Sequence, residues 1–209
     1  VEGFPGPALR ELIRAHNLYD RLAALGVRAT FANAYYVEDV ADVHARRIQS
    51  VTTVAALKAF GTVRDTAAML AGRAVYQDLT RVSLRAQGYE GPLATPETSA
   101  RDLLGIAEDH GFTLFEYFQT DRAGHKGSPE DVRRVLALFD AFIGVAASFG
   151  ARPGCLFVLT SDHGNIEEAG SPQHSVNPVP FVAVGEGAGF LRERVRRVTD
   201  VTPALVEWF

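Results

Sequence analysis

The feature that most constrains the fold is an alternation of helical and strand patterns in the second half of the chain. Residues 95–110 begin with Thr-Pro-Glu, a helix start signal, and continue with apolar residues at helical spacing. A second start signal lies at 128–131. Strand patterns follow each helix: the aromatic-rich run at 112–118 and the continuous apolar run at 155–160. A further strand, limited by its prolines to an edge or entry position, is predicted at 178–185. This alternation predicts an α/β fold with a mostly parallel sheet flanked by helices.

The first half of the chain divides into two parts. Residues 1–35 fit the same scheme, with two helical patterns followed by a strand. Residues 36–94 carry Ala-rich helical patterns and no clear strand, which indicates a helical insertion or cap. A plain helical crossover is the alternative, although about 60 residues is long for one. We therefore expect one core, built from residues 1–35 and 95–209, with an insertion at 36–94.

Composition argues against several kinds of partner. With a net charge of -4, the chain offers little of the clustered basic surface that nucleic acids need. No apolar stretch approaches the length of about 18 residues that spans a membrane. The chain has one cysteine, Cys155, which cannot form an internal disulfide and suits a cytoplasmic protein. We expect neither a nucleic acid nor a membrane partner, and the oligomeric state stays open.

Acidic and histidine side chains gather next to the predicted strands. Two pairs follow the strands at 112–118 and 155–160, and a further histidine precedes the strand at 178–185. These residues are Asp121, His125, Asp162, His163 and His174. The carboxyl edge of an open α/β sheet is where ligands bind, and carboxylates and imidazoles suit Zn²⁺ or Mn²⁺. Gly124, Gly127 and Gly164 would let the backbone approach closely.

A simpler explanation applies to any one of these pairs, because an acid and a histidine in a turn often only hydrogen-bond to each other. The same applies to the remaining histidines. His16 and His110 lie at predicted helix C-termini, where the helix dipole favours them, and His44 lies in the insertion without an evident partner.

Three motifs carry a resemblance to a known family. They are TDRAGH at 120–125, SDHGNIEE at 161–168 and HSVNPVPFV at 174–182. Their order and composition resemble the alkaline phosphatase superfamily, in the branch of cofactor-independent phosphoglycerate mutase and phosphopentomutase. The resemblance covers roughly residues 112–184, and the final helix pattern also resembles that of the family. Residues 1–110 match no motif of the family.

The resemblance implies an alkaline phosphatase-like core with a site for two divalent metal ions, Mn²⁺ or Zn²⁺. By motif position, Asp121, His125 and His174 would hold one ion, while Asp162 and His163 would supply half of the ligands of the other. In the family, the remaining ligands come from an N-terminal strand ending in Asp-Gly and from a Ser or Thr nucleophile.

The sequence contains no Asp-Gly and begins with Val1 rather than Met. We therefore expect a core that is incomplete at its N-terminus, one metal site that is incomplete, and a chain that is inactive alone.

The resemblance also suggests supporting roles. Asn165 and Glu167 could orient the ligand imidazoles, and Arg122 and Lys126 could meet a substrate phosphate, unless they are simply solvated. The function implied is metal-dependent phosphoryl transfer on a small phosphorylated substrate. The alternatives are a hydrolase of phosphate, phosphonate or sulfate esters, and a non-catalytic metal-binding protein.

Overall fold

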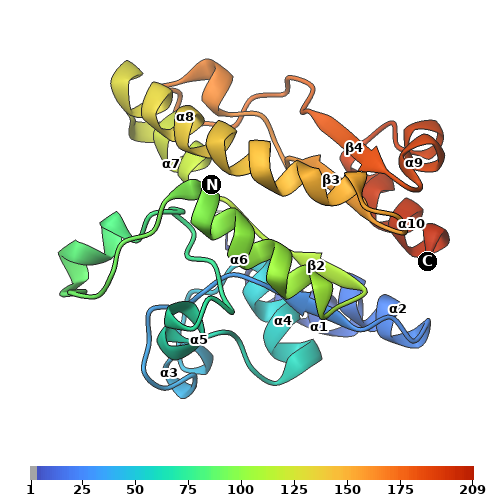
Figure 1. Cartoon of the computed structure of the whole chain (residues 1–209), viewed down its shortest axis with the longest axis horizontal. Coiled ribbons are helices and arrows are strands. Elements are labelled where there is room, and N and C mark those ends of the chain that lie inside the picture. Colours follow the sequence, from blue (N-terminus) through green and yellow to red (C-terminus); the bar gives the residue numbers. More distant parts are fainter. Residues whose placement is uncertain (1–3) are drawn as a thin grey trace.

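The computed structural model describes residues 4–209 as a mixed α/β fold (Figure 1). The elements of the first half are α1 (Pro7–Ala15), α2 (Leu18–Ala24), β1 (Ala29–Phe31), α3 (Ala41–His44), α4 (Val51–Phe60), α5 (Thr66–Leu70) and the 3₁₀ helix η1 (Val82–Gln87). Those of the second half are α6 (Pro96–Glu108), β2 (Phe112–Leu114), α7 (Gln119–Lys126), α8 (Pro129–Ala146), η2 (Ala147–Ala151), β3 (Leu156–Thr160), η3 (Ile166–Glu168), β4 (Phe181–Gly185), α9 (Ala188–Arg194) and α10 (Val198–Trp208).

The strands form two pairs. β1 and β2 are parallel, with Ala29 opposite Phe112, whereas β3 and β4 are antiparallel, with Leu156 opposite Gly185. The prediction of a mostly parallel sheet therefore holds only for β1 and β2. A parallel neighbour for β3 would need a long crossover, but the chain returns from β3 to β4 through a loop that contains only η3.

The strand predicted at 112–118 ends at Leu114, because a side chain replaces a strand as its partner. Asn33 is 4% exposed, and its Nδ2 donates to the Glu116 carbonyl at 2.8 Å. The Glu116 N–H donates back to Asn33 Oδ1 at 2.8 Å. The chain then turns into α7, so Asp121 and His125 lie on a helix and not in the predicted loop.

Residues 36–94 contain α3, α4, α5 and η1, in agreement with the predicted helical character. They also reach the sheet, because Val75 and Arg64 form parallel bridges to Asn33 and Ala34, just beyond β1. The boundaries of the insertion stay a prediction.

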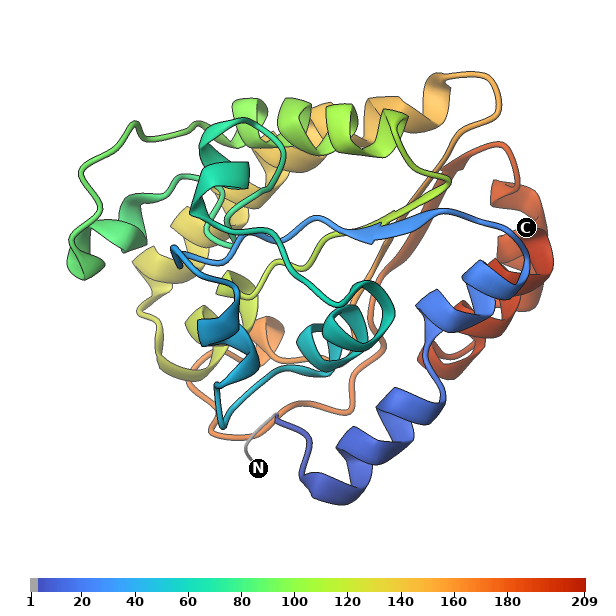
Figure 2. The ribbon, with the colours of Figure 1, turned by 90° about the horizontal axis from the view of Figure 1, so that it is seen from below.

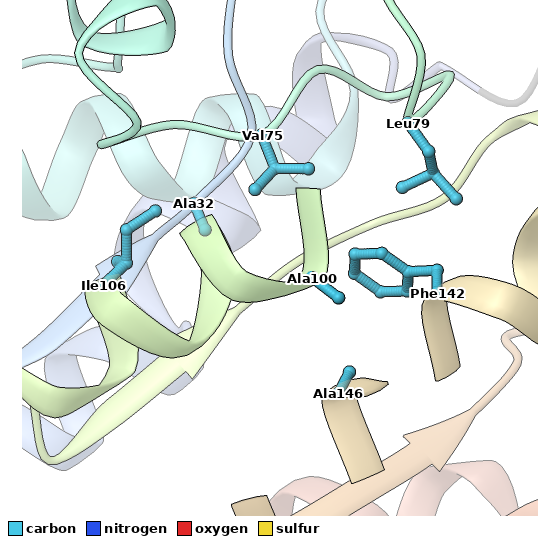
Figure 3. Close-up of a cluster of buried hydrophobic side chains, with 7 residues drawn as sticks. All are labelled: Ala32, Val75, Leu79, Ala100, Ile106, Phe142 and Ala146. Carbon is cyan, nitrogen blue, oxygen red and sulfur yellow. The ribbon is translucent and has the colours of Figure 1, made fainter. Parts of the chain in front are cut away.

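The main core lies between α6 and α8. Its buried side chains are Ala32, Val75, Leu79, Ala100, Ile106, Phe142 and Ala146. Figure 3 shows the Phe142 ring pointing from α8 towards Ala100 of α6 and Leu79. α6 and α8 run side by side along one side of the molecule, and α1 lies on the opposite side (Figure 2). The β3–β4 pair packs its Leu156 and Val158 against α9 and α10.

One helical segment among the described residues, Pro129–Ala151, is long and apolar enough by length and composition to cross a membrane. The expectation that no stretch approaches that length is therefore wrong. In this fold the segment contributes Val135, Phe142 and Ala146 to the protein interior.

Candidate metal centre

Helix α7 fixes the relative position of the first two predicted ligands. Asp121 and His125 are four residues apart, so their side chains lie on the same face of the helix. Asp121 is in the first turn and His125 in the last, an arrangement that the helix dipole favours at both ends.

Three imidazoles converge on one carboxylate oxygen. The Nε2 atoms of His174, His125 and His163 lie 3.3, 3.4 and 3.9 Å from Asp121 Oδ1. The ligand atoms of Asp121, His163 and His174 all lie within 4.8 Å of one another. These side chains come from α7, from the loop after β3 and from the segment before β4, so the fold brings together groups that are far apart in the sequence.

The orientations of the imidazoles suit ligands. His125 Nδ1 lies 3.1 Å from the Ser171 carbonyl, which accepts a hydrogen bond from it and leaves Nε2 free to face Asp121. The His163 and His174 rings stack with centroids 3.5 Å apart. His163 Nδ1 is buried and has no hydrogen-bond partner among the described residues, so a structural hydrogen bond does not account for the position of this ring.

Asn165 and Glu167 support the centre, although not through the imidazoles. Asn165 is 6% exposed, and its Nδ2 donates to Asp121 Oδ1 at 2.8 Å. Glu167 accepts from the Asn165 N–H at 2.8 Å and from the Ser175 hydroxyl. These hydrogen bonds lower the pKa of Glu167 to about 2, with that from Ser175 the largest cause. Glu167 thus ties the loop after β3 to the residue next to His174.

Close backbone approach at Gly124 allows this packing. A Cβ atom there would lie 1.5 Å from Asn165 Oδ1 and 3.1 Å from the Ile166 nitrogen. At Gly164, a Cβ atom would lie 2.2 Å from Ser175 Oγ. Both glycines were predicted to serve close approach, and the structure gives each of them a definite neighbour.

Asp162 is less enclosed than the other acid. Its side chain is 83% exposed, and Oδ2 lies 3.5 Å from His163 Nε2. The resemblance pairs His163 with Asp162, whereas the geometry also brings His163 to Asp121 and His174. Which residue holds which ion stays a prediction.

The remaining predicted residues lie outside this convergence. Arg122 and Lys126 are exposed on α7, where each directly follows one of the predicted ligands, Asp121 and His125. His110 follows α6 and its Nδ1 contacts the Ile106 carbonyl at 2.7 Å, while His16 caps α1. His44 does have a partner, the Gly61 carbonyl, at 3.1 Å.

Sequence reasoning missed Glu116, a carboxylate that the charge of Asp162 influences. Thr52 Oγ1 donates to its Oε2 at 2.5 Å. Burial is the largest cause that raises the pKa of Glu116, to about 7, with the Asp162 charge adding to it and the Thr52 hydrogen bond opposing it. Only the fold could show this, because Thr52 lies far away in the sequence. Ser175 and Asn177 were also missed, although they lie within the HSVNPVPFV motif.

The donor set fits a divalent metal ion. One carboxylate and three imidazoles offer the oxygen and nitrogen ligands that Zn²⁺ and Mn²⁺ take. Two of these ligands also have a hydrogen-bond partner that orients them: Asn165 for Asp121 and the Ser171 carbonyl for His125.

Comparisons with known proteins agree with this chemistry. The family described as "Metalloenzyme superfamily" matches residues 93–207, just over half of the chain. Over 125 residues the chain is 33% identical to a 2,3-bisphosphoglycerate-independent phosphoglycerate mutase of Cereibacter sphaeroides, covering 55% of this chain and 24% of that protein. Equally named proteins of Paracoccus denitrificans and Clostridioides difficile are 32% and 30% identical, over 55% and 54% of this chain and 24% and 25% of their own. No solved structure matches. The chain thus spans about a quarter of the length of these relatives.

Proposed function

Because the chain belongs to the Metalloenzyme superfamily, we propose that Asp121, His163 and His174, together with His125 beside Asp121, form a divalent metal centre that serves phosphoryl transfer. The observation that carries the proposal is the convergence of three Nε2 atoms on Asp121 Oδ1. The mutase-named relatives support a phosphomutase-like reaction.

The residues of this chain orient the centre. The Asn165 amide fixes one oxygen of Asp121, and the Ser171 carbonyl fixes the tautomer of His125. A bound Zn²⁺ or Mn²⁺ would supply positive charge that polarises a phosphoryl oxygen and lowers the pKa of a bound hydroxyl. Arg122 and Lys126 are exposed beside the ligands, where they could bind a phosphate group of a small phosphorylated substrate.

A second ion and the nucleophile complete the proposal. Asp162, with its exposed carboxylate, would contribute to a second ion, together with ligands that in the resembled family come from a strand ending in Asp-Gly. The resemblance to the phosphomutase branch suggests a Ser or Thr nucleophile that follows such a strand. Phosphoryl transfer depends mostly on positioning and charge stabilisation, so this chain alone would turn over very slowly.

The first test is the number of ions bound. Metal-free protein, titrated with Zn²⁺ or Mn²⁺ in a calorimeter, should bind about one ion per chain at neutral pH. Asp121→Asn and His174→Ala should each abolish this binding. Asp140→Asn, which changes an exposed acid on α8, is the matched control and should bind normally. Absence of binding, two ions held equally well, or normal binding by Asp121→Asn would contradict the proposal.

The second test is activity. Residues 1–209 should show negligible turnover of generic phosphate esters. A longer protein that includes a strand ending in Asp-Gly and a Ser or Thr nucleophile should be active with Mn²⁺ or Zn²⁺. In that protein Asp162→Asn should abolish activity, whereas His110→Ala should change it little, since His110 is bonded to α6. Release of inorganic phosphate from the substrate would favour a hydrolase over a mutase.

A further inference from the structure

A pocket of about 240 Å³ opens between α1, α4 and the segment that joins α3 to α4. Five of the side chains that line it are basic: Arg10, Arg14, His44, Arg46 and Lys58. None of the proposed metal ligands lines it. The pocket is therefore separate from the metal centre.

The positive charge of the pocket is largely uncompensated. Lys58 pairs with Asp20 at 2.8 Å. Across the described residues 4–209, Arg10, Arg14 and Arg46 have no carboxylate within 4.0 Å, the distance that defines an ion pair. Like charges so close together repel one another, and a bound anion would relieve that repulsion.

Two of the basic side chains, Arg10 and Arg46, make contacts that limit their movement. Arg10 donates from Nε to the Pro5 carbonyl at 3.0 Å and from Nη2 to the Arg47 carbonyl at 2.5 Å. The Arg46 guanidinium lies 5.9 Å from the centre of the Tyr35 ring. Gln49, which is 7% exposed, donates to the Val43 carbonyl at 2.8 Å and fixes the segment that carries Arg46. A site whose donors are positioned in advance loses less entropy when it binds.

We infer that this pocket binds a small phosphate-bearing anion. Guanidinium groups match the geometry of phosphate oxygens, and three of them share this site. The buried Val54 and the partly buried Leu57 provide an apolar wall for a short carbon skeleton. The volume lies just below the roughly 300–1,000 Å³ of sites for drug-sized ligands, which favours a compact ligand. A nucleic acid would need an extended basic face, and the chain carries a net charge of -4.

Pyrophosphate and inorganic phosphate are suitable probes, used with the whole chain in EDTA so that no metal ion contributes. Calorimetry should show one saturable site whose affinity falls as the salt concentration rises. Arg14→Ala and Arg46→Ala should each weaken binding by about tenfold, because each removes a charge-assisted contact. Arg133→Ala is the matched control, since Arg133 is an exposed arginine on α8 with a side chain 74% exposed, and should bind normally.

Nuclear magnetic resonance of the wild-type protein gives a readout that does not depend on whether the variants fold. Pyrophosphate should shift the Arg10 Nε–Hε signal and the amide signals of residues 44–49. Shifts confined to other residues, no saturable binding, or normal binding by a folded Arg14→Ala variant would overturn the inference. So would tighter binding of a short RNA or of phosphatidylserine vesicles than of pyrophosphate, since the ligand would then be a macromolecular surface.

Discussion

At the scale of single residues, Gly124 shows how closely the centre is packed. It lies on α7, where the helix meets Asn165, and Asn165 in turn donates to Asp121. The backbone at Gly124 is ordinary helix, so the glycine is required for space and not for an unusual backbone angle.

Gly124→Ala should therefore push α7 away from the loop after β3. We expect a loss of about 1–3 kcal/mol in the free energy of unfolding, as for other overpacked sites, together with weaker Zn²⁺ binding. Gly144→Ala on α8 is the matched control, because a Cβ atom there meets nothing within 4 Å. That variant should be unchanged or more stable by up to about 1 kcal/mol. Urea unfolding and calorimetry measure both effects, and equal behaviour of the two variants would rule out the packing argument.

Sequence reasoning worked best for residues whose chemistry is visible in their type. Asp121, His125, Asp162, His163 and His174 were predicted to gather at one sheet edge, with His163 and Asp162 assigned to a second ion. In the structure the Nε2 atoms of the three histidines lie within 3.9 Å of Asp121 Oδ1. Sequence reasoning could not predict that Asn165 would hydrogen-bond to a carboxylate and not to an imidazole, because that depends on which side of α7 the loop after β3 approaches. Glu116 was invisible for the same reason, since its partners Asn33 and Thr52 are distant in the sequence.

At the scale of elements, helix α8 links the centre to the core. Its start was predicted at 128–131, and the structure adds a capping box there, in which Ser128 and Asp131 bond to each other's backbone N–H groups. The end of β2 was harder to predict. An aromatic run such as 112–118 favours a strand by propensity, but the Asn33 side chain takes the hydrogen bonds of Glu116 that a neighbouring strand would have used.

Phe142→Ala should remove the largest fully buried side chain between α8 and α6. A cavity of that kind costs about 3–5 kcal/mol of unfolding free energy. Leu136→Ala, on the same helix with the side chain 44% exposed, should cost much less, under about 1 kcal/mol. Chemical denaturation compares them directly. Similar losses in both variants would mean that the α6–α8 contact does not hold the core.

At the scale of the whole molecule, helices α9 and α10 connect the two strand pairs, because Phe112 of β2 and Leu156 of β3 pack against the same buried side chains of these helices. The overall α/β character could be predicted from the sequence, because the helix start signals and apolar runs are local. The pairing of strands could not, since it depends on which distant segments meet. Two such segments contact Glu116. Its backbone N–H donates to Asn33, just after β1, and its side chain accepts a hydrogen bond from Thr52 of α4.

Stability should depend on pH through Glu116. Its pKa is raised from an ordinary value of 4.5 to about 7, so the folded state keeps a proton that the unfolded state has released between those values. This group therefore favours the folded state below about pH 4.5, and that advantage is lost as the pH rises towards 7.

Glu116→Gln should remove this loss. Between pH 4.5 and 8 its free energy of unfolding should rise above that of the wild type, by on the order of 2 kcal/mol. Urea unfolding in EDTA across that range measures the difference. Glu130→Gln, which changes an exposed glutamate on α8, is the control and should run parallel to the wild type. A Glu116→Gln curve that also runs parallel would show that Glu116 titrates normally.

The helical setting of Asp121 and His125 also determines which insertions and deletions the centre can tolerate. One extra residue between them would turn His125 by about 100° around the helix axis and carry its imidazole away from the other ligands. Added residues between β2 and α7 would instead move both side chains together and keep their spacing. Length variation among relatives of this chain should accordingly fall on either side of α7 and spare the four-residue interval within it.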